Sequence, residues 1–318
     1  MSRSLWTWGR RIAPGLVLAA LVWRLGTSPF LAGFRTVNAG ALAVAAGLIA
    51  VTTVCCAWRW KIVAGGLGVE LSLPAAVAAY YRALFLNVTL PGGLAGDVHR
   101  GISHGRDVSD VSRALRAVAW ERFAGQVVQV LVTVVVLLAL PSPVHGYMPW
   151  VAIGIAAMCV VLLLAGARAA GARSAWARLR RAALCDIRGA LLPRRAWPGI
   201  AIASALVVAG HAATFLLAAR TAGVSAPPSR MLPLALLATA AMVLPSVGGW
   251  GPREGMTAWA FAAAGLGAQR GVATAVVYGV MVLTATSPGA TVLVMAWFRR
   301  NRPPERSRPP LQERAAHA

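Results

Sequence analysis

Two stretches rich in glycine and proline interrupt apolar segments of the chain: LPGGLAGDVHRG at 90–101 and LPSVGGWGPREG at 244–255. Each begins with Leu-Pro, continues through small residues, and carries an acid and an arginine close to a final glycine. Proline removes a backbone donor and ends a helix, while glycine allows a positive φ and a close approach of backbone to a ligand. The pattern therefore predicts two broken helices, whose turn residues are Pro91, Gly92, Gly93, Gly96, Pro245, Gly248, Gly249 and Gly251.

The remainder of the chain is too apolar for a soluble protein. Of its 318 residues, 58% are hydrophobic and 13% are charged, whereas soluble domains have about 25% charged residues. Several apolar stretches reach or approach the roughly 20 residues that a helix needs to cross the hydrocarbon core. We expect membrane spans at 12–31, 38–58, 117–140, 147–166, 198–219 and 272–297.

The distribution of charge predicts the orientation of these spans. The chain has 31 Lys and Arg against 9 Asp and Glu, a formal net charge of +22. Most of the basic residues precede the first span, follow the second, or lie in 99–116, in 167–197 and after 298, and the positive-inside rule places all of these segments in the cytoplasm. The loop 141–146 has no basic residue and is expected outside. The charge thus has an explanation without nucleic acid, for which no reader motif is present.

In this orientation each interrupted segment must enter and leave the membrane on one side, 76–103 from the cytoplasm and 231–266 from outside. We therefore expect an all-α polytopic membrane protein with about eight membrane segments, two of them re-entrant hairpins. The halves 12–140 and 147–297 both contain two spans, a hairpin and a span, and they start from opposite sides. This arrangement predicts an inverted-topology repeat with a substrate site near the midplane.

The domain organisation follows from the same segments. Residues 1–298 are expected to form a single transmembrane domain. The segment 299–318 is rich in Arg and Pro, and we expect it to be a disordered cytoplasmic tail, so that both termini lie in the cytoplasm.

Six charged residues lie at the hairpins or at the start of a span, where an ionised side chain is costly unless it is paired. They are Asp97, Arg100, Glu121, Arg122, Arg253 and Glu254. Neighbouring helical residues point in different directions, so Glu121 and Arg122 are expected to pair with the hairpins rather than with each other. We predict that the six line a polar cavity, in which the arginines hold a phosphate and Asp97 and Glu254 balance charge or contact a cationic head group. The alternative is that the ion pairs only hold the hairpins to neighbouring helices.

No catalytic residue, cofactor or metal site is predicted. His99 and His104 lie near Asp97, but no third ligand follows at a spacing typical of a metal site. His211, alone in an apolar span, is expected to be a hydrogen-bonded core residue. No stretch resembles a nucleotide-binding loop, so ATP is not expected to drive the protein directly.

Three motifs carry a resemblance to a known family. The stretches LPGGLAGDVHRG, WERFAG at 120–125, and LPSVGGWGPREG occur in the order found in the transmembrane, flippase-like domain of the lysylphosphatidylglycerol synthase family, which the chain resembles over about residues 10–298. The resemblance implies a bacterial or archaeal cytoplasmic-membrane protein with about eight membrane segments. In the best-understood members this domain moves aminoacylated phosphatidylglycerol to the outer leaflet, and a separate soluble domain performs the lysyl transfer.

The chain departs from this family pattern in two places. Only the Arg- and Pro-rich tail follows residue 298, so we expect aminoacyl transfer to be absent. The resemblance places an arginine after the tyrosine of the last span, whereas this chain has Tyr278-Gly279. Some stand-alone members occur beside glycosyltransferases or polyprenyl-linked pathways.

We interpret the sequence as that of a lipid translocase without enzymatic activity in the bacterial cytoplasmic (inner) membrane. Its expected partners are membrane lipids, either an anionic phospholipid or a polyprenyl phosphate, together with a possible synthetase or glycosyltransferase. Two other functions remain open. One is an intramembrane enzyme on lipid-linked substrates, with Asp97, His99 or Glu121 as acid or base. The other is a membrane subunit that anchors a glycosyltransferase through the loop 167–197.

Overall fold

The computed structural model describes residues 16–168 and 175–300, and the regular secondary structure of this part of the chain is helical apart from an isolated bridge between Val247 and Trp250. Its elements are a helix at Leu16–Leu25, α2 (Ser28–Thr36), α3 (Ala39–Gly66), α4 (Leu73–Thr89), α5 (Ala95–Asp107), α6 (Val111–Ala139), η1 (His145–Tyr147), α7 (Met148–Arg168), α8 (Ala175–Asp186), η3 (Ile187–Leu191), α9 (Trp197–Thr221), α10 (Pro228–Ala240), η4 (Ala241–Val243), α11 (Pro252–Ala263), α12 (Ala268–Thr286) and α13 (Pro288–Arg300). The all-α prediction is confirmed for these residues.

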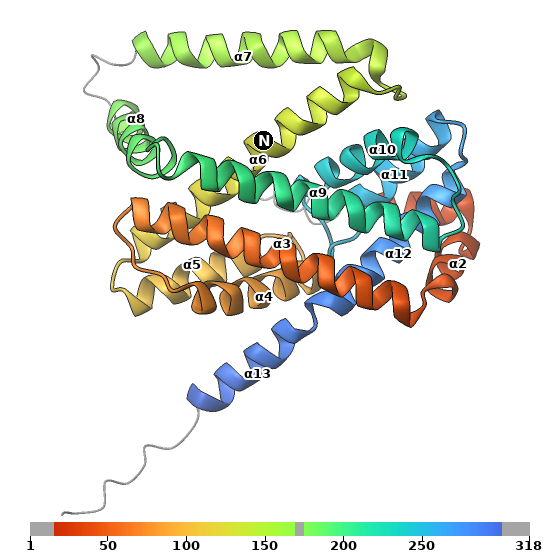
Figure 1. The fold of residues 1–318 in the computed structure, drawn as a ribbon, viewed down its shortest axis with the longest axis horizontal. Coiled ribbons are helices and arrows are strands. Elements are labelled where there is room, and N and C mark those ends of the chain that lie inside the picture. Colours follow the sequence, from red (N-terminus) through yellow and green to blue (C-terminus); the bar gives the residue numbers. More distant parts are fainter. Residues whose placement is uncertain (1–15, 169–174, 301–318) are drawn as a thin grey trace, which may run out of the picture.

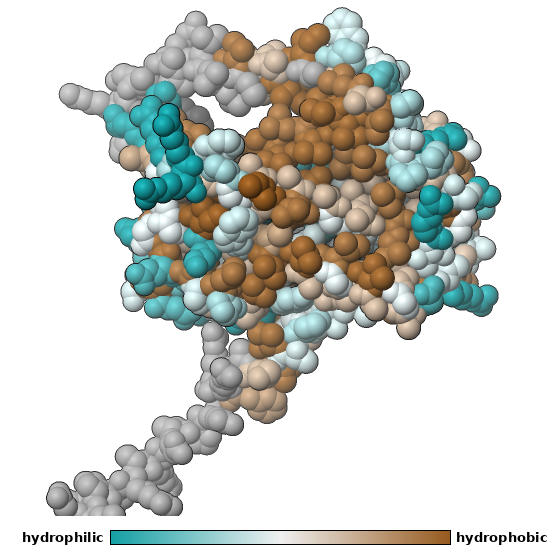
Figure 2. All heavy atoms as spheres, viewed as in Figure 1, coloured by the Kyte–Doolittle hydropathy of each residue, from teal (hydrophilic) through white to brown (hydrophobic). Residues whose placement is uncertain are grey.

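Four of the described helical segments are long and apolar enough to cross a membrane: Ala39–Gly66, Val111–Ala139, Trp197–Thr221 and Ala268–Met295. In Figure 1, α3 and α9 run side by side between the left and right edges of the molecule. Figure 2 shows an apolar surface across the middle of this view and hydrophilic residues gathered toward both edges. The chain is therefore a multi-pass membrane protein, as predicted.

Local sequence signals explain where these helices begin and end. Asn38 caps α3, because its Oδ1 accepts the backbone N–H of Ala41 at 2.8 Å, and Asp110 caps α6 by accepting that of Arg113 at 2.9 Å. Such side chains satisfy N–H groups that have no partner within the helix. Gly68 has a φ of +71° just after α3, a conformation that glycine adopts without strain at a helix end. The helix α3 therefore extends beyond the predicted span 38–58.

The first predicted span, 12–31, is wrong as a single straight helix. The helix Leu16–Leu25 and α2 are bent by 96° at a short break, and residues 12–15 lie outside the described part of the chain. Gly26 at the break has a φ of +74°, and Pro29 begins the next helix. The stretch Gly26-Thr27-Ser28-Pro29 is the signal in the sequence that marks this break.

Both glycine- and proline-rich stretches form turns between packed helices. The first turn joins α4 to α5, and the second joins α10 and η4 to α11. The φ angles of Gly92, Gly93, Gly248, Gly249 and Gly251 are all positive, so residues with a side chain would be strained there. Gly96 is helical instead, and it is required for packing: an added Cβ would lie 2.0 Å from the carbonyl oxygen of Ala83 in α4.

The two turns, more than 150 residues apart in sequence, contact each other. The N–H of Gly92 donates to the carbonyl oxygen of Ser246 at 2.8 Å. A Cβ on Gly93 would lie 3.2 Å from Ser246 Oγ, and one on Gly249 would lie 3.5 Å from Val88 Cα. The tips of the two helical hairpins thus meet, although α4 and α5 lie on the left of Figure 1 and α10 and α11 on the right.

The core that supports this meeting point is formed by α3, α9, α10, α11 and α12. Their buried side chains make one apolar cluster that includes Phe215, Phe261 and Met281. The helices α3 and α9 approach closely at Gly210, where an added Cβ would lie 2.2 Å from Thr52. The predicted span 147–166 corresponds to α7. Beyond Arg300, the predicted tail lies outside the described residues.

Candidate functional site

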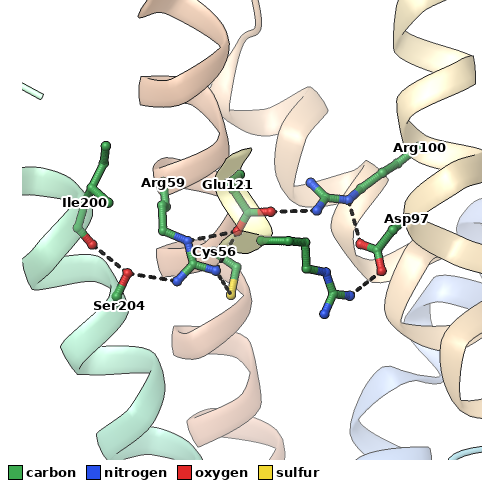
Figure 3. Close-up of polar contacts among 8 residues, drawn as sticks. Cys56, Arg59, Asp97, Arg100, Glu121, Ile200 and Ser204 are labelled. Atoms are coloured by element: carbon green, nitrogen blue, oxygen red, sulfur yellow. Dashed lines mark hydrogen bonds and ion pairs between the residues drawn. The ribbon is translucent and has the colours of Figure 1, made fainter. Parts of the chain in front are cut away.

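Four of the six charged residues predicted to line a cavity come together beside the first hairpin. Asp97 and Arg100 come from α5, and Glu121 and Arg122 come from α6. Nε of Arg100 donates to Asp97 at 3.0 Å and its Nη2 donates to Glu121 at 2.7 Å, while Arg122 donates to Asp97. As predicted, Glu121 and Arg122 pair with the hairpin and not with each other (Figure 3).

A fifth member, Arg59, lies within α3, whereas the predicted span 38–58 ended just before it and placed it in the segment that follows; that placement after the helix is wrong. Its Nε and Nη2 donate to Oε1 of Glu121 at 2.8 and 2.5 Å, and its Nη1 donates to Ser204 of α9 at 3.0 Å. Gly125 leaves room for this guanidinium, since an added Cβ would lie 2.8 Å from it. The helix ends at Gly66, within the stretch Gly65-Gly66-Leu67-Gly68, and this signal in the sequence places Arg59 inside the helix.

These five side chains form what we call the ion network: Arg59, Asp97, Arg100, Glu121 and Arg122. Glu121 lies at its centre, is 0% exposed, and is held by arginines on two sides. Removing an ionised carboxylate from water costs several kcal/mol, and such a charge persists only where it is paired and hydrogen-bonded. The network therefore joins α3, α5, α6 and, through Ser204, α9 into one unit (Figure 3).

One end of the network is open. The side chain of Arg122 is 36% exposed, whereas that of Arg100 is 0% exposed. Nη2 of Arg122 donates to Asp97, and its Nε, which is buried, has no hydrogen-bond partner among the described residues. A guanidinium has five N–H donors in a planar fork that suits carboxylate and phosphate oxygens. The exposed part of Arg122 is therefore the part of the ion network that lies closest to the surface of the protein.

Asn87, at the last turn of α4, fixes Asp97 in place. Its Nδ2 donates to Asp97 at 2.9 Å, and its Oδ1 accepts the backbone N–H of Gly96 at 2.8 Å. The second bond satisfies an N–H in the first turn of α5 that has no partner within the helix. Sequence analysis had not included Asn87 in the site.

Arg100 also lies against two aromatic rings. Its Cζ is 4.6 Å from the ring centroid of Trp60 and 4.2 Å from that of Tyr80. Both rings are buried, so these cation–π contacts are shielded from water and stabilise the guanidinium.

The remaining two predicted residues, Arg253 and Glu254, form a separate pair at the start of α11. Nε and Nη2 of Arg253 donate to Oε1 of Glu254 at 2.9 and 2.5 Å. Oε2 of Glu254 accepts the N–H of Gly251 at 2.7 Å. In the described part of the chain, no ion pair connects this second pair to the ion network. The structure thus divides the six predicted residues into two clusters, one at each hairpin.

The second pair accounts for the glycine at position 279, where the resemblance to the family places an arginine. The guanidinium of Arg253 lies over the rings of Trp250 and Tyr278, with its Cζ at 5.4 and 5.1 Å from their centroids. A Cβ on Gly279 would lie 2.6 Å from Nη2 of Arg253. The space beside position 279 is therefore filled by an arginine from another helix. Nδ1 of His211 is 2.9 Å from the Tyr278 hydroxyl, which makes His211 a hydrogen-bonded residue, as predicted.

Two further polar residues, Asp186 and His104, contact other side chains of the protein. Oδ2 of Asp186 accepts a hydrogen bond from Nε1 of Trp120 at 3.0 Å and lies 3.4 Å from Nε of Arg116. His104 contacts the Trp60 ring edge-on, with the ring centroids 5.5 Å apart. In the described ranges, no three His, Cys, Asp or Glu side chains are grouped so that they could hold a metal ion.

Replacing Asn87 by alanine should destabilise the protein, because it removes a partner of both Asp97 and Gly96. The loss of a hydrogen bond from a buried charged group typically costs about 1–3 kcal/mol. We expect a lower midpoint of thermal unfolding for Asn87→Ala in detergent. Thr89→Ala is the matched control, since the Thr89 hydroxyl is exposed and bonds only to the Phe85 carbonyl of its own helix. Equal midpoints for the two variants would contradict this role of Asn87.

Comparison with known proteins agrees with the motifs in these hairpins. No curated protein sequence matches the chain. The family model described as the lysylphosphatidylglycerol synthase TM region matches residues 11–289, which include both hairpins, the ion network and the second pair. The match covers most of the chain and confirms the resemblance found in the sequence. The chain therefore belongs to the lysylphosphatidylglycerol synthase TM region family, whose role is related to membrane lipids.

Proposed function

We propose that the protein is a lipid translocase that moves a phospholipid or a polyprenyl-phosphate-linked lipid between the leaflets of the membrane. The head group would bind at the open end of the ion network while the acyl or prenyl tails stay in the bilayer. Membership of a lipid-related family supports this function, as do the membrane-spanning helices. In this proposal the protein carries the lipid and performs no chemistry on it.

The exposed guanidinium of Arg122 is the observation on which the proposal depends. It is partly exposed in a chain whose described part includes four helical segments long and apolar enough to cross a membrane. An arginine in such surroundings is costly unless it binds an anion or reaches water. A lipid phosphate supplies such an anion, and its two oxygens match the fork of the guanidinium.

The proposed path for the head group passes between the two hairpins. We propose that both are re-entrant, that they enter from opposite sides, and that the halves 12–140 and 147–297 form an inverted repeat. The meeting of the turns at Gly92 and Ser246, with the hairpins on opposite sides of Figure 1, supports this arrangement. Irregular backbone at membrane depth occurs where protein buries it or where it lines a cavity.

The remaining features of the proposal concern location and partners. We propose a bacterial cytoplasmic membrane, with both termini in the cytoplasm, because the basic segments would then face the anionic inner leaflet. A synthetase or glycosyltransferase would supply the lipid, and the movement would be downhill or driven by a gradient.

Transport is tested by reconstituting the protein in liposomes with fluorescent phosphatidylglycerol and with a polyprenyl phosphate. The wild type should move at least one of them faster than empty liposomes do. Arg122→Gln should slow this movement about tenfold or more, since a charge-assisted hydrogen bond contributes about 1.5–3 kcal/mol. Arg113→Gln is the control, because Arg113 is an exposed arginine of the same helix that pairs only with Asp110.

If the wild type moves neither lipid, the translocase proposal fails for these substrates. Equal rates for Arg122→Gln and Arg113→Gln would show that the open guanidinium plays no part. Chromatography of the recovered lipid separates a carrier, which leaves it unchanged, from an intramembrane enzyme, which would convert it.

The re-entrant topology is tested by labelling single cysteines with a membrane-impermeant maleimide in intact cells. Cysteines at Ser72 and Asp107, the two ends of the first hairpin, should both be labelled only after the cells are permeabilised. Those at Ser229 and Gln269, beside the two ends of the second hairpin, should both be labelled from outside. All four positions are exposed.

The control for this experiment uses the exposed native Cys185 as the inside reference and Gly146→Cys as the outside reference. The other cysteines, Cys55, Cys56 and Cys159, would be replaced by alanine. Labelling of the two ends of one hairpin from different sides would rule out re-entrance for that hairpin.

A further inference from the structure

We infer that the site selects head groups with a single negative charge, and that the net charge of the ion network, rather than a contact with the head group, determines this selection. This inference rests on the proposed translocase function and specifies its substrate class. It separates a phosphodiester monoanion from a zwitterionic head group and from a phosphomonoester or diphosphate.

The ion network contains more positive than negative side chains. Three arginines meet two carboxylates in the ion network, so one positive charge is left over. The second pair, Arg253 and Glu254, contributes one charge of each sign and is neutral. The excess cation therefore belongs to the first hairpin and its neighbours.

The end of the network at Arg122 is the one that an outside group can reach. Glu121 is shared by Arg59 and Arg100, and Asp97 is shared by Arg100 and Arg122. Of these five described side chains, that of Arg122 is 36% exposed while the other four are buried. An anion that binds from outside thus meets Arg122, the one guanidinium of the ion network that is partly exposed.

The net charge of the ion network and its ligand matters because the buried surroundings screen charges only weakly. In a low dielectric, unit charges a few ångströms apart interact far more strongly than in water. A monoanion brings the network to neutrality, whereas a dianion would leave an excess negative charge and a zwitterion would leave the positive charge in place. An uncompensated charge of either sign is unfavourable inside a membrane.

Ser204 provides a way to change this charge without touching the bound group. It is 1% exposed on α9, behind Arg59, and its Oγ lies 3.0 Å from Nη1 of Arg59. Ser204→Asp would place a carboxylate against an arginine and bring the net charge of the network to zero. The matched variant Ser204→Asn introduces a side chain of nearly the same size as aspartate. It keeps an acceptor for Arg59 and leaves the net charge of the ion network at plus one.

The experiment compares rates for three fluorescent lipids with identical tails in liposomes at pH 8. Phosphatidylglycerol carries one negative charge, phosphatidylcholine is zwitterionic, and phosphatidic acid carries nearly two, because the second pKa of a phosphomonoester is about 6. The readout is the ratio of rates within each variant, which a general loss of folded protein does not alter. The wild type and Ser204→Asn should prefer phosphatidylglycerol over both other lipids. Ser204→Asp should lose its preference over phosphatidylcholine, with a ratio near one.

A double variant provides an independent check. Arg59→Met with Glu121→Gln removes one charge of each sign and retains the excess of one through Arg100, Arg122 and Asp97. It should keep the preference for phosphatidylglycerol even if its rates are low. We call the dependence of the lipid preference on the net charge of the network the charge rule. If Ser204→Asp does not fold, Ser204→Asn and the double variant still test the charge rule against the wild type.

The outcomes separate a failure of the charge rule from a failure of the proposed translocase function. Wild-type protein that moves none of the three lipids contradicts both. Wild-type protein that moves lipids without preferring the monoanion, or Ser204→Asp with an unchanged preference, overturns the charge rule and leaves the translocase proposal standing. A double variant that loses the preference would show that specific contacts of Arg59 or Glu121, and not the net charge, select the lipid.

Discussion

The buried carboxylate of Glu121 is the constraint on which the rest of the site depends. It has no exposure to solvent, so it requires cationic partners, and these come from α3 and α5 while Glu121 itself lies on α6. Asp97 extends the chain of pairs to Arg122 and to Asn87 of α4. Removing one partner of such a group typically costs about 3–5 kcal/mol, so the arrangement resists changes in any single helix. The same pairing leaves one guanidinium open to a ligand.

The two hairpins resemble each other in sequence but differ in their electrostatics. Both turns use glycines with positive φ, and they meet through the bond from Gly92 to Ser246. At the second hairpin the charges are satisfied locally, since Glu254 binds both Arg253 and the helix N-terminus, and aromatic rings cover the arginine. At the first hairpin the charges reach across to α3 and α6. The proposed function therefore uses the first cluster as the binding site, while the contacts of the second pair are all made within the protein.

Much of this architecture could be predicted from the sequence. The turns were predicted because glycine and proline have specific backbone requirements, and the pairing of Glu121 and Arg122 with the hairpin followed from helical geometry. The membership of Arg59 was not predicted, because a basic residue near the end of an apolar run looks like a topology signal. Only the distance between the Asn38 cap and the glycine stop at Gly65–Gly68 indicates that it lies within the helix. The division into two clusters depends on side-chain packing, such as that of Arg253 beside Gly279, which no local pattern encodes.

The central claim is that a lipid phosphate binds at the open end of the ion network. The most direct test is an electron cryomicroscopy structure of the wild-type protein in nanodiscs that contain phosphatidylglycerol. Our account predicts head-group density within hydrogen-bond distance, about 3 Å, of the Arg122 guanidinium, with the lipid tails directed into the bilayer. A map in which Arg122 bonds only to protein groups, and in which lipid head groups lie only at the membrane surfaces, would contradict it.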